Sequence, residues 1–341
     1  MAELETLVVN AGSTSLKLSL VDEDDVSTCL DSLEPAPSGV AAVAHRIVHG
    51  GPRFVEPVVI DGAVEDELRA LIELAPLHNR PALAALDDAR RALPDVPHVA
   101  VFDTAFHSTI PAEAATYPVP RHWREEWGIR RYGFHGLSVA WSAERVPASR
   151  LVVCHLGGGC SVTAVLDGRS VETTMGFSPL DGVPMATRSG GLDPEILLHL
   201  LRSGRLGVEE IEQALEEHSG LYGLGGSSHV DELELSPEPE ARLALDVFAH
   251  RVAAAVAGMC TALGGLDALV FTAGIGEKSA PVRANVCRRL RFLGVELDEE
   301  RNAGAQPDAE IAAAGSAVRV VVVHAREDVV AARAARRLLR P

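Results

Sequence analysis

The stretch LVVNAGSTSLKLSLVD, residues 7–22, contains two apolar runs separated by a turn of small polar residues. Its second run alternates leucine with lysine or serine, which is the period of a half-buried strand. The turn at residues 10–15 contains a glycine, which would let an anion approach backbone N–H groups. The pattern predicts a hairpin, and its hydroxyl-rich turn either faces water or binds a phosphate.

The same pattern recurs in RLVVCHLGGGCSVTAVLDG, residues 150–168. Two hairpins of one design, each near the start of one half of the chain, predict a duplicated domain. A third segment, residues 266–290, reads as a strand, the turn Gly274-Ile275-Gly276 and then a helix, whose N-terminus would favour an anion. It lacks the lysine and the Ser/Thr ending of a P-loop.

Length and composition limit the classes of function. A chain of 341 residues predicts two domains, and a net charge of −17 argues against nucleic acid or a membrane surface as a partner. No apolar stretch looks long enough to span a bilayer, so we expect no membrane association. The five cysteines form no metal-like spacing and read as reduced thiols, which indicates a cytoplasmic protein.

The remaining pattern is that of an α/β protein. Buried strands are expected at residues 98–106 and 318–324, and helices at 81–93, within 230–263 and at 327–340.

Four charged side chains stand out next to these elements. Arg46 ends an apolar run, Asp103 ends the buried run of the segment that starts at residue 98, His135 lies in RRYGFHGLS, and Arg188 lies on a Ser-Gly-Gly loop. Taken singly, such an Asp usually caps a helix and such an Arg usually covers surface. Together with three anion-friendly turns they match phosphoryl transfer, in which the protein positions the reactants and neutralises charge.

Eight segments then occur in an order that resembles the acetokinase family of short-chain carboxylic acid kinases. They are VVNAGSTSLKLSL, HRIVHGG, LAPLHNRPAL, FDTAFHSTIP, RYGFHGLS, HLGGGCS, TTMGFSPLDGVPMATRSGGLDP and FTAGIGEKS. The resemblance covers nearly the whole chain.

The resemblance implies an α/β fold of two ribonuclease-H-like domains, of the acetate and sugar kinase/Hsp70/actin type, with a nucleotide cleft between them. The expected domains are 1–104 with 327–341, and 105–326. It also implies acetate kinase activity, in which the ATP γ-phosphoryl group is transferred reversibly to acetate. Mg²⁺, with Mn²⁺ as a substitute, is the implied metal, and a homodimer is the implied assembly.

The family's functional residues carry over to matching positions. The implied catalytic set is Arg46, Asp103, His135 and Arg188. The acyl group is assigned to Arg46, Val48, Leu77, His78, Phe134 and Pro179. The nucleotide is assigned to Ser13, Ser15, Lys17, His155, Leu156, Gly157, Gly158, Gly159, His229, Val230, Asp231, Gly274, Ile275, Gly276, Glu277 and Lys278. The metal is assigned to Asn10 and Glu327.

Departures from the family pattern gather on the nucleotide side. Gly158 replaces a phosphate-facing amide, Lys278 ends the GIGEK segment, and His229–Asp231 replaces an Asp-Met-Arg run. Arg326 occupies the place of a metal-linked glutamate, with Glu327 beside it. The acid substrate is therefore predicted more firmly than the phosphoryl donor.

Three alternatives stay open. The acid could be propionate or butyrate, and the donor could be another nucleotide or pyrophosphate. In a different class, the chain could be a nucleotide-binding regulatory protein without turnover. The intact set of Arg46, Asp103, His135 and Arg188 favours an enzyme, because a pure binding protein would not need it.

Overall fold

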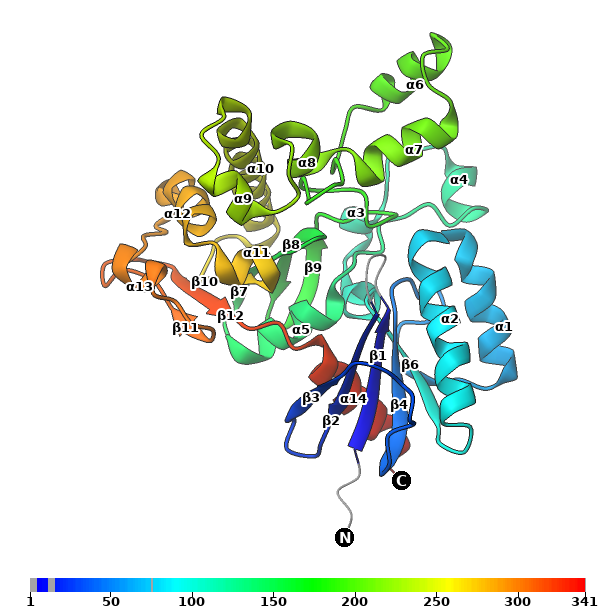
Figure 1. The fold of residues 1–341 in the computed structure, drawn as a ribbon. Helices are drawn as coiled ribbons and strands as arrows, with labels where there is room; N and C mark the ends of the chain where they lie inside the picture. The colour runs from blue at the N-terminus through cyan, green and yellow to red at the C-terminus, as the bar shows by residue number, and fades with distance from the viewer. Residues whose placement is uncertain (1–4, 12–15, 75, 341) are drawn as a thin grey trace. The chain divides into compact units, whose positions relative to one another are not determined.

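The computed structural model describes residues 5–11, 16–74 and 76–340, with the side chains of residues 76–78 outside that description. The chain divides into two compact units. The first contains residues 1–108, 134–141 and 326–341, and the second contains residues 109–133 and 142–325. Figure 1 shows both units as sheets with flanking helices.

The first unit is built on a six-stranded sheet in the order β3-β2-β1-β4-β6-β5. Strands β1 and β2 form the predicted antiparallel hairpin, while β1, β4 and β6 run parallel. The strands are β1 Glu5–Ala11, β2 Leu16–Val21, β3 Ser27–Leu30, β4 Val40–Ile47, β5 Val58–Val59 and β6 His98–Phe102. Its helices are α1 Gly62–Ala70, η1 Leu71–Leu74, α2 Pro76–Ala92 and α14 Glu327–Leu339, and η2 Ala105–Thr109 begins in it.

Helices α2 and α14 both contact β1 and β4. Leu7 and Val43 belong to the core that α2 covers, and successive strand residues point to opposite faces. The even-numbered residues of β1 and β4 therefore face α14. This parity decides which side chains meet the start of α14.

The second unit repeats this strand order as β9-β8-β7-β10-β12-β11. Strands β7 and β8 form the second predicted hairpin, and β7, β10 and β12 run parallel. The strands are β7 Arg150–Leu156, β8 Cys160–Leu166, β9 Arg169–Thr173, β10 Ala268–Thr272, β11 Ala309–Glu310 and β12 Arg319–Val323. The duplicated hairpin in the sequence thus corresponds to a duplicated sheet.

The helices of the second unit include the long α10 and the α6–α7 pair. They are α3 Ala112–Ala115, α4 Arg121–Glu125, α6 Pro194–Arg202, α7 Val208–Glu217, α8 Gly220–Gly225, α9 Val230–Leu235, α10 Pro239–Leu263, α11 Ala273–Lys278, α12 Ala280–Arg289, η3 Arg291–Leu293 and α13 Glu299–Ala303. Helix α5, Gly136–Arg145, begins in the first unit and ends in the second.

Two expectations from the sequence are wrong in detail. Helix α10 is long and apolar enough to cross a membrane by length and composition, with a mean hydropathy of 1.5. It nevertheless packs on β7, β8 and β9, with Phe248 and Val252 fully buried, as a core helix does. The glycines of the third segment do not form a turn before a helix, because α11 begins at Ala273, directly after β10.

The cysteines are free thiols, as the sequence predicts. Cys29 is exposed, and the other four are buried. Burial raises the pKa of the Cys154 thiol well above its ordinary value and that of Cys160 to about 12. These two cysteines beside the second glycine segment therefore act as small packing residues rather than as nucleophiles.

Candidate active site

A row of polar side chains crosses three strands of the first sheet. Asn10 on β1 pairs in register with Lys17 on β2 and with Arg46 on β4. Because residues in register share a face of the sheet, the three side chains line up toward the face that α14 covers. The Arg46 Nη1 donates to the Asn10 Oδ1 at 2.9 Å.

Arg46 also forms a two-pronged ion pair with Asp103, the residue that follows β6. Its Nε donates to Oδ1 at 2.8 Å, and its Nη2 donates to Oδ2. The Asp103 side chain is 1% exposed, so this carboxylate depends on its partner. Burial acts to lower the pKa of Arg46, but the carboxylates of Asp103 and Glu327 outweigh it and raise the pKa. Asp103 thus pairs with an arginine and is not a helix cap.

The first residue of α14 completes this cluster. The Glu327 Oε2 accepts a hydrogen bond from the Asn10 Nδ2 at 3.3 Å and lies 3.9 Å from the Arg46 Nη1. Arg326 instead donates to the backbone oxygen of Asp25 at 3.0 Å. The structure therefore turns Glu327, not Arg326, toward Asn10 and Arg46.

The position of α14 is fixed by an acidic turn between β2 and β3. Asp25 has a positive φ of 64°, and its carboxylate accepts from Arg333 at 2.9 Å and from Arg336 at 2.7 Å. Charge-assisted bonds of this kind are stronger than neutral ones. They tie the C-terminal helix, and with it Glu327, to the first hairpin.

His135 is held against Asp103 by its backbone. Its N–H donates to the Asp103 carboxylate, and its φ of 60° lies in the left-handed region. The next residue, Gly136, donates to the Asp103 backbone oxygen at 2.9 Å, and a Cβ there would lie 2.2 Å from that oxygen. Only glycine permits this approach, which brings the backbone of the half-buried His135 next to Asp103.

The structure describes part of the predicted acyl pocket. Val48 and Phe134 are buried in the first unit, and Pro179 is buried in the second. The Phe134 ring meets the His49 ring edge-on at a centroid distance of 5.4 Å. Four predicted residues lie outside the described part of the chain or have undescribed side chains, namely Ser13, Ser15, Leu77 and His78.

The second glycine segment lies beside α11. His155 on β7 pairs in register with Thr272, and an added Cβ on Gly157 would contact the Ala273 side chain at 3.5 Å and the Gly274 nitrogen at 3.8 Å. Leu156 is buried, and Gly157 and Gly159 share a backbone hydrogen bond of 3.0 Å. The structure thus brings together two segments that the sequence predicts to bind phosphate.

Gly158 differs from its neighbours because it is exposed and an added Cβ would meet no atom within 4 Å. The departure from an amide side chain at this position is therefore not imposed by crowding.

The other predicted nucleotide residues have varied surroundings. The Glu277 carboxylate accepts from the His324 Nδ1 at 2.7 Å and from the Ala325 N–H at 2.9 Å, so it ties α11 to the end of β12. Lys278 is exposed at the end of α11. Exposed side chains are also found at His229, which precedes α9, and at Asp231, whereas Val230 is buried. Ile275 is half-buried and Gly276 is buried.

Arg188 is the predicted cation of the second unit. Its Nη1 donates to the Pro179 oxygen at 3.1 Å, and its Nε lies 3.2 Å from the Glu216 Oε2 on α7. Its Nη2 makes no hydrogen bond to any residue that the structure describes. Burial lowers the pKa of Arg188 and raises that of Glu216, each shift partly offset by the opposite charge.

The sequence does not predict the acidic partners of Arg188 and of the arginines on α14. Glu216 is one of several glutamates in VEEIEQALEE, and Asp25 is one of four acidic residues at positions 22–25. No spacing rule separates either one from solvated surface charge. Only the pairing of α7 with the Arg188 loop, and of α14 with the first hairpin, reveals them.

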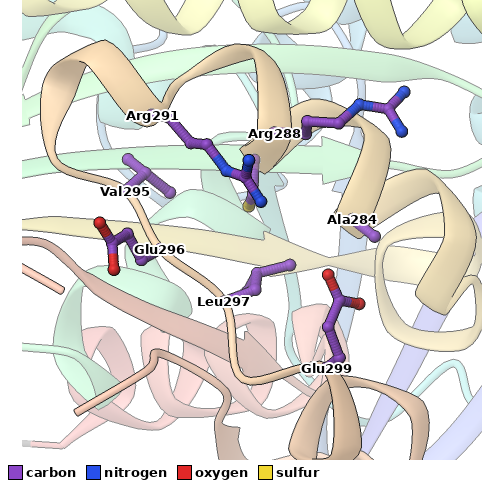
Figure 2. Close-up of a pocket in the computed structure, with 8 residues that line it drawn as sticks. Ala284, Arg288, Arg291, Val295, Glu296, Leu297 and Glu299 are labelled. Carbon is purple, nitrogen blue, oxygen red and sulfur yellow. The ribbon is translucent and has the colours of Figure 1, made fainter. Parts of the chain in front are cut away.

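One cavity of about 270 Å³ lies away from these residues. It is lined by α12, η3 and the segment leading into α13, including Cys287, Arg288, Arg291, Glu296 and Glu299 (Figure 2). It contains none of the predicted site residues.

Comparison with known proteins agrees with the motifs. The profile of the acetokinase family matches residues 24–333, nearly the entire chain. The chain belongs to the acetokinase family. It is 47% identical over 309 residues to the acetate kinase of Gloeobacter violaceus, covering 86% of this chain and 75% of that protein. It is 45% identical over 320 residues to the acetate kinase of a Synechococcus strain, covering 90% and 79%.

Solved structures of acetokinase-type enzymes have the same fold. A propionate kinase from Francisella tularensis has a TM-score of 0.92 at 33% identity, over 98% of this chain and 99% of its own. The acetate kinase of Porphyromonas gingivalis has a TM-score of 0.87 at 29% identity, over 99% and 100%. The fold class expected from the sequence is thereby confirmed.

Proposed function

We propose that the chain catalyses reversible transfer of the ATP γ-phosphoryl group to acetate, giving acetyl phosphate and ADP. As a member of the acetokinase family it is a phosphotransferase with a carboxyl group as acceptor. The observation that carries the proposal is the cluster of Asn10, Arg46, Asp103 and Glu327 at the ends of parallel strands. Such an edge is where α/β sheets bind ligands.

Arg46 has the donors that this reaction needs. Among the residues that the structure describes, Asp103 and Asn10 accept from three of its five N–H groups, which leaves one on each terminal nitrogen for an anion. We assign these donors to the acyl carboxylate or the transferring phosphoryl group. Asp103 then fixes the plane of the guanidinium, and His135 beside it would stabilise the charge that develops in the transition state.

The acceptor needs no general base, because acetate is already ionised at neutral pH. The work of the protein is to hold carboxylate and phosphoryl oxygens in line and to neutralise their charge. Arg188 is the second cation assigned to this task, and its unoccupied Nη2 supports that assignment.

The phosphoryl donor is assigned to the first hairpin and to the two glycine segments of the second unit. Lys17 of the first hairpin, His155–Gly159 and Gly274–Lys278 would bind the phosphates through N–H groups and charge. His229–Asp231 would lie near the base.

Mg²⁺ fits the residues present, and Mn²⁺ is an acceptable substitute. The Glu327 carboxylate is a hard oxygen donor that accepts from the Asn10 Nδ2. The Asn10 Oδ1 accepts from Arg46 and keeps a second lone pair that could bind the ion. Mg²⁺ is usually held by one or two carboxylates plus substrate phosphates, so a larger protein ligand set is not required. When bound, the ion would neutralise phosphate charge during transfer.

Acetate is the proposed acid because Val48, Leu77, Phe134 and Pro179 match the family's small apolar pocket, with His78 assigned as a further substrate-binding histidine. Such a pocket discriminates one methylene by only 10- to 200-fold, and one structural relative is a propionate kinase. Propionate or butyrate, and donors such as pyrophosphate, remain the alternatives to be tested.

A hydroxamate-trapping assay with several acids and donors tests the proposal. We expect acetyl hydroxamate from acetate with ATP and Mg²⁺, and a smaller yield from propionate. Lack of any acyl phosphate, together with measurable ATP binding, would instead support the regulatory protein.

We also propose a homodimer formed through α6. No side chain of α6 is buried, and its apolar residues Ile196, Leu198 and Leu201 are 46%, 50% and 41% exposed. Leu198 and Leu201, three residues apart, share one face of the helix, and this exposed apolar pair favours a second copy of the chain as its cover. Light scattering should give twice the monomer mass, and Leu198→Glu should shift the mass toward that of a monomer.

A cytoplasmic location and a two-domain division, residues 1–104 with 327–341 and 105–326, complete the proposal. This division differs from the compact units at residues 105–108, 134–141 and 326.

A further inference from the structure

We propose that Glu216 is a positioning residue that orients Arg188 for the phosphoryl-transfer step, an inference that rests on the proposed function. The Arg188 Nε lies 3.2 Å from the Glu216 Oε2, and the two side chains are only 13% and 17% exposed. An ion pair of this low exposure is screened less by solvent than a surface pair.

The contacts of Arg188 fix the plane of its guanidinium. Glu216 holds the Nε edge, the Pro179 oxygen accepts from Nη1 at 3.1 Å, and the Met185 sulfur lies 3.6 Å from the same nitrogen. A planar guanidinium that is held at two of its nitrogens cannot rotate about the Cδ–Nε bond. The remaining N–H groups, including both on Nη2, are thereby kept in one direction for an anion.

Backbone contacts bind the Arg188 loop to the end of α7. Ser189 donates to the Leu215 oxygen at 3.1 Å, the Thr187 hydroxyl donates to the Glu216 oxygen at 2.7 Å, and Ser219 donates to the Thr187 oxygen at 2.8 Å. Glu216 therefore reaches Arg188 from a segment that is itself hydrogen-bonded to both neighbours of Arg188.

Gly220 permits this close approach. It has a φ of 59°, and an added Cβ would lie 2.2 Å from the Met185 oxygen and 2.7 Å from the Arg188 oxygen. The segment that follows α7 thus packs directly on the backbone of the arginine loop, and the ion pair is part of that packing.

The test compares Glu216→Gln with a matched control on the same helix. Glu216→Gln keeps the size of the side chain and removes its charge, whereas Glu209→Gln makes the same change at an exposed position on the same helix. We expect Glu216→Gln to lower kcat between about tenfold and a hundredfold, because small displacements of a catalytic group cost that much. The KM for ATP should stay within about twofold, and Glu209→Gln should change neither constant.

Glu216→Asp provides a second variant that keeps the charge on a shorter side chain. It should recover part of the kcat that Glu216→Gln loses. Thermal unfolding of each variant shows whether the fold is intact, and equal losses in Gln and Asp variants that both unfold early would overturn the assignment.

A double-mutant cycle with Arg188→Ala separates positioning from general damage. If Glu216 acts through Arg188, adding Glu216→Gln to Arg188→Ala should lower kcat by less than about twofold more. A full additional loss would show that Glu216 acts elsewhere. Near-normal activity of Arg188→Ala alone would remove Arg188 from the mechanism, an outcome distinct from failure of the Glu216 assignment.

Discussion

Arg46 and Asp103 form a bidentate ion pair between the parallel strand β4 and the residue after β6, and the Asp103 side chain is 1% exposed. This pair has two effects. It gives the buried Asp103 carboxylate its hydrogen-bond donors, and it fixes the direction of the remaining Arg46 N–H groups. Loss of the arginine should therefore affect stability and catalysis separately.

Arg46→Ala should lower kcat by at least about a hundredfold, since the variant loses donors that strengthen as phosphoryl charge redistributes. It should also destabilise the protein by roughly 3–5 kcal/mol, because Asp103 is left as an unpaired buried carboxylate. Urea unfolding and steady-state kinetics at 25 °C measure the two effects. Adding Asp103→Asn should restore much of the stability and none of the activity, and near-normal turnover of Arg46→Ala would remove Arg46 from the mechanism.

Val48→Ala should shift the acid preference toward longer acids. If Val48 lines the acyl pocket, the variant has room for one more methylene, and kcat/KM for propionate relative to acetate should rise roughly tenfold to a hundredfold. Val43→Ala is the matched control, because Val43 is a buried valine of the α2-facing core on β4. An unchanged acid preference in Val48→Ala would place the pocket elsewhere.

Gly158→Asn should strengthen binding of the phosphoryl donor. The position is exposed and an added Cβ meets no atom within 4 Å, so we expect the amide to be accommodated. One new hydrogen bond is worth about 1 kcal/mol, which corresponds to a KM for ATP that is about fivefold lower. Gly158→Ala fills the same space without a donor and should leave KM unchanged. Equal KM values for the Asn and Ala variants would show that residue 158 does not face a phosphate.

Buried histidines should make the protein sensitive to acid. Burial lowers the pKa of His107 to about 4, from an ordinary value of 6.5, while its Nε2 donates to the Phe134 oxygen at 2.8 Å. The unfolded chain therefore takes up the proton first, so the stabilisation is complete above pH 6.5 and is lost as the pH falls toward 4. A gap of about 2.5 pH units at about 1.36 kcal/mol each gives a loss of roughly 3 kcal/mol.

His107→Gln should reduce the slope of stability against pH in that window, as measured by urea unfolding at several pH values. The exposed His250→Gln is the control and should leave the slope as in the parent protein. His45 and His98, whose pKa values burial also lowers, will keep part of the slope in both variants. Parallel curves for His107→Gln and the parent would contradict the assignment.

The sequence predicts the two hairpins that begin the sheets because strand periodicity and glycine turns are local signals. The strands before Asp103 and after residue 318, and the closing helix, are confirmed for the same reason. The row of Lys17, Asn10 and Arg46 could not be read from sequence, because it depends on the register between β1 and the distant β4.

Other contacts lie beyond sequence reasoning because long segments separate the partners. Glu216 is 28 positions from Arg188, and Arg333 is 308 positions from Asp25. The start of α11 at Ala273 was missed because glycines normally indicate a turn, whereas here the helix follows β10 without a linker. Tertiary packing has overridden the local propensity.

The return of α14 to the first sheet has a consequence for synthesis on the ribosome. The first unit needs residues 326–341, including the arginines that hold Asp25, yet these residues are translated only after the whole of the second unit. Most of the second unit, residues 142–325, is one continuous segment, so it can pack before residues 326–341 are translated. We therefore expect the half that is translated first to be the last to finish folding, so that a nascent chain stalled before residue 326 would expose the α14-facing side of its first sheet to chaperones.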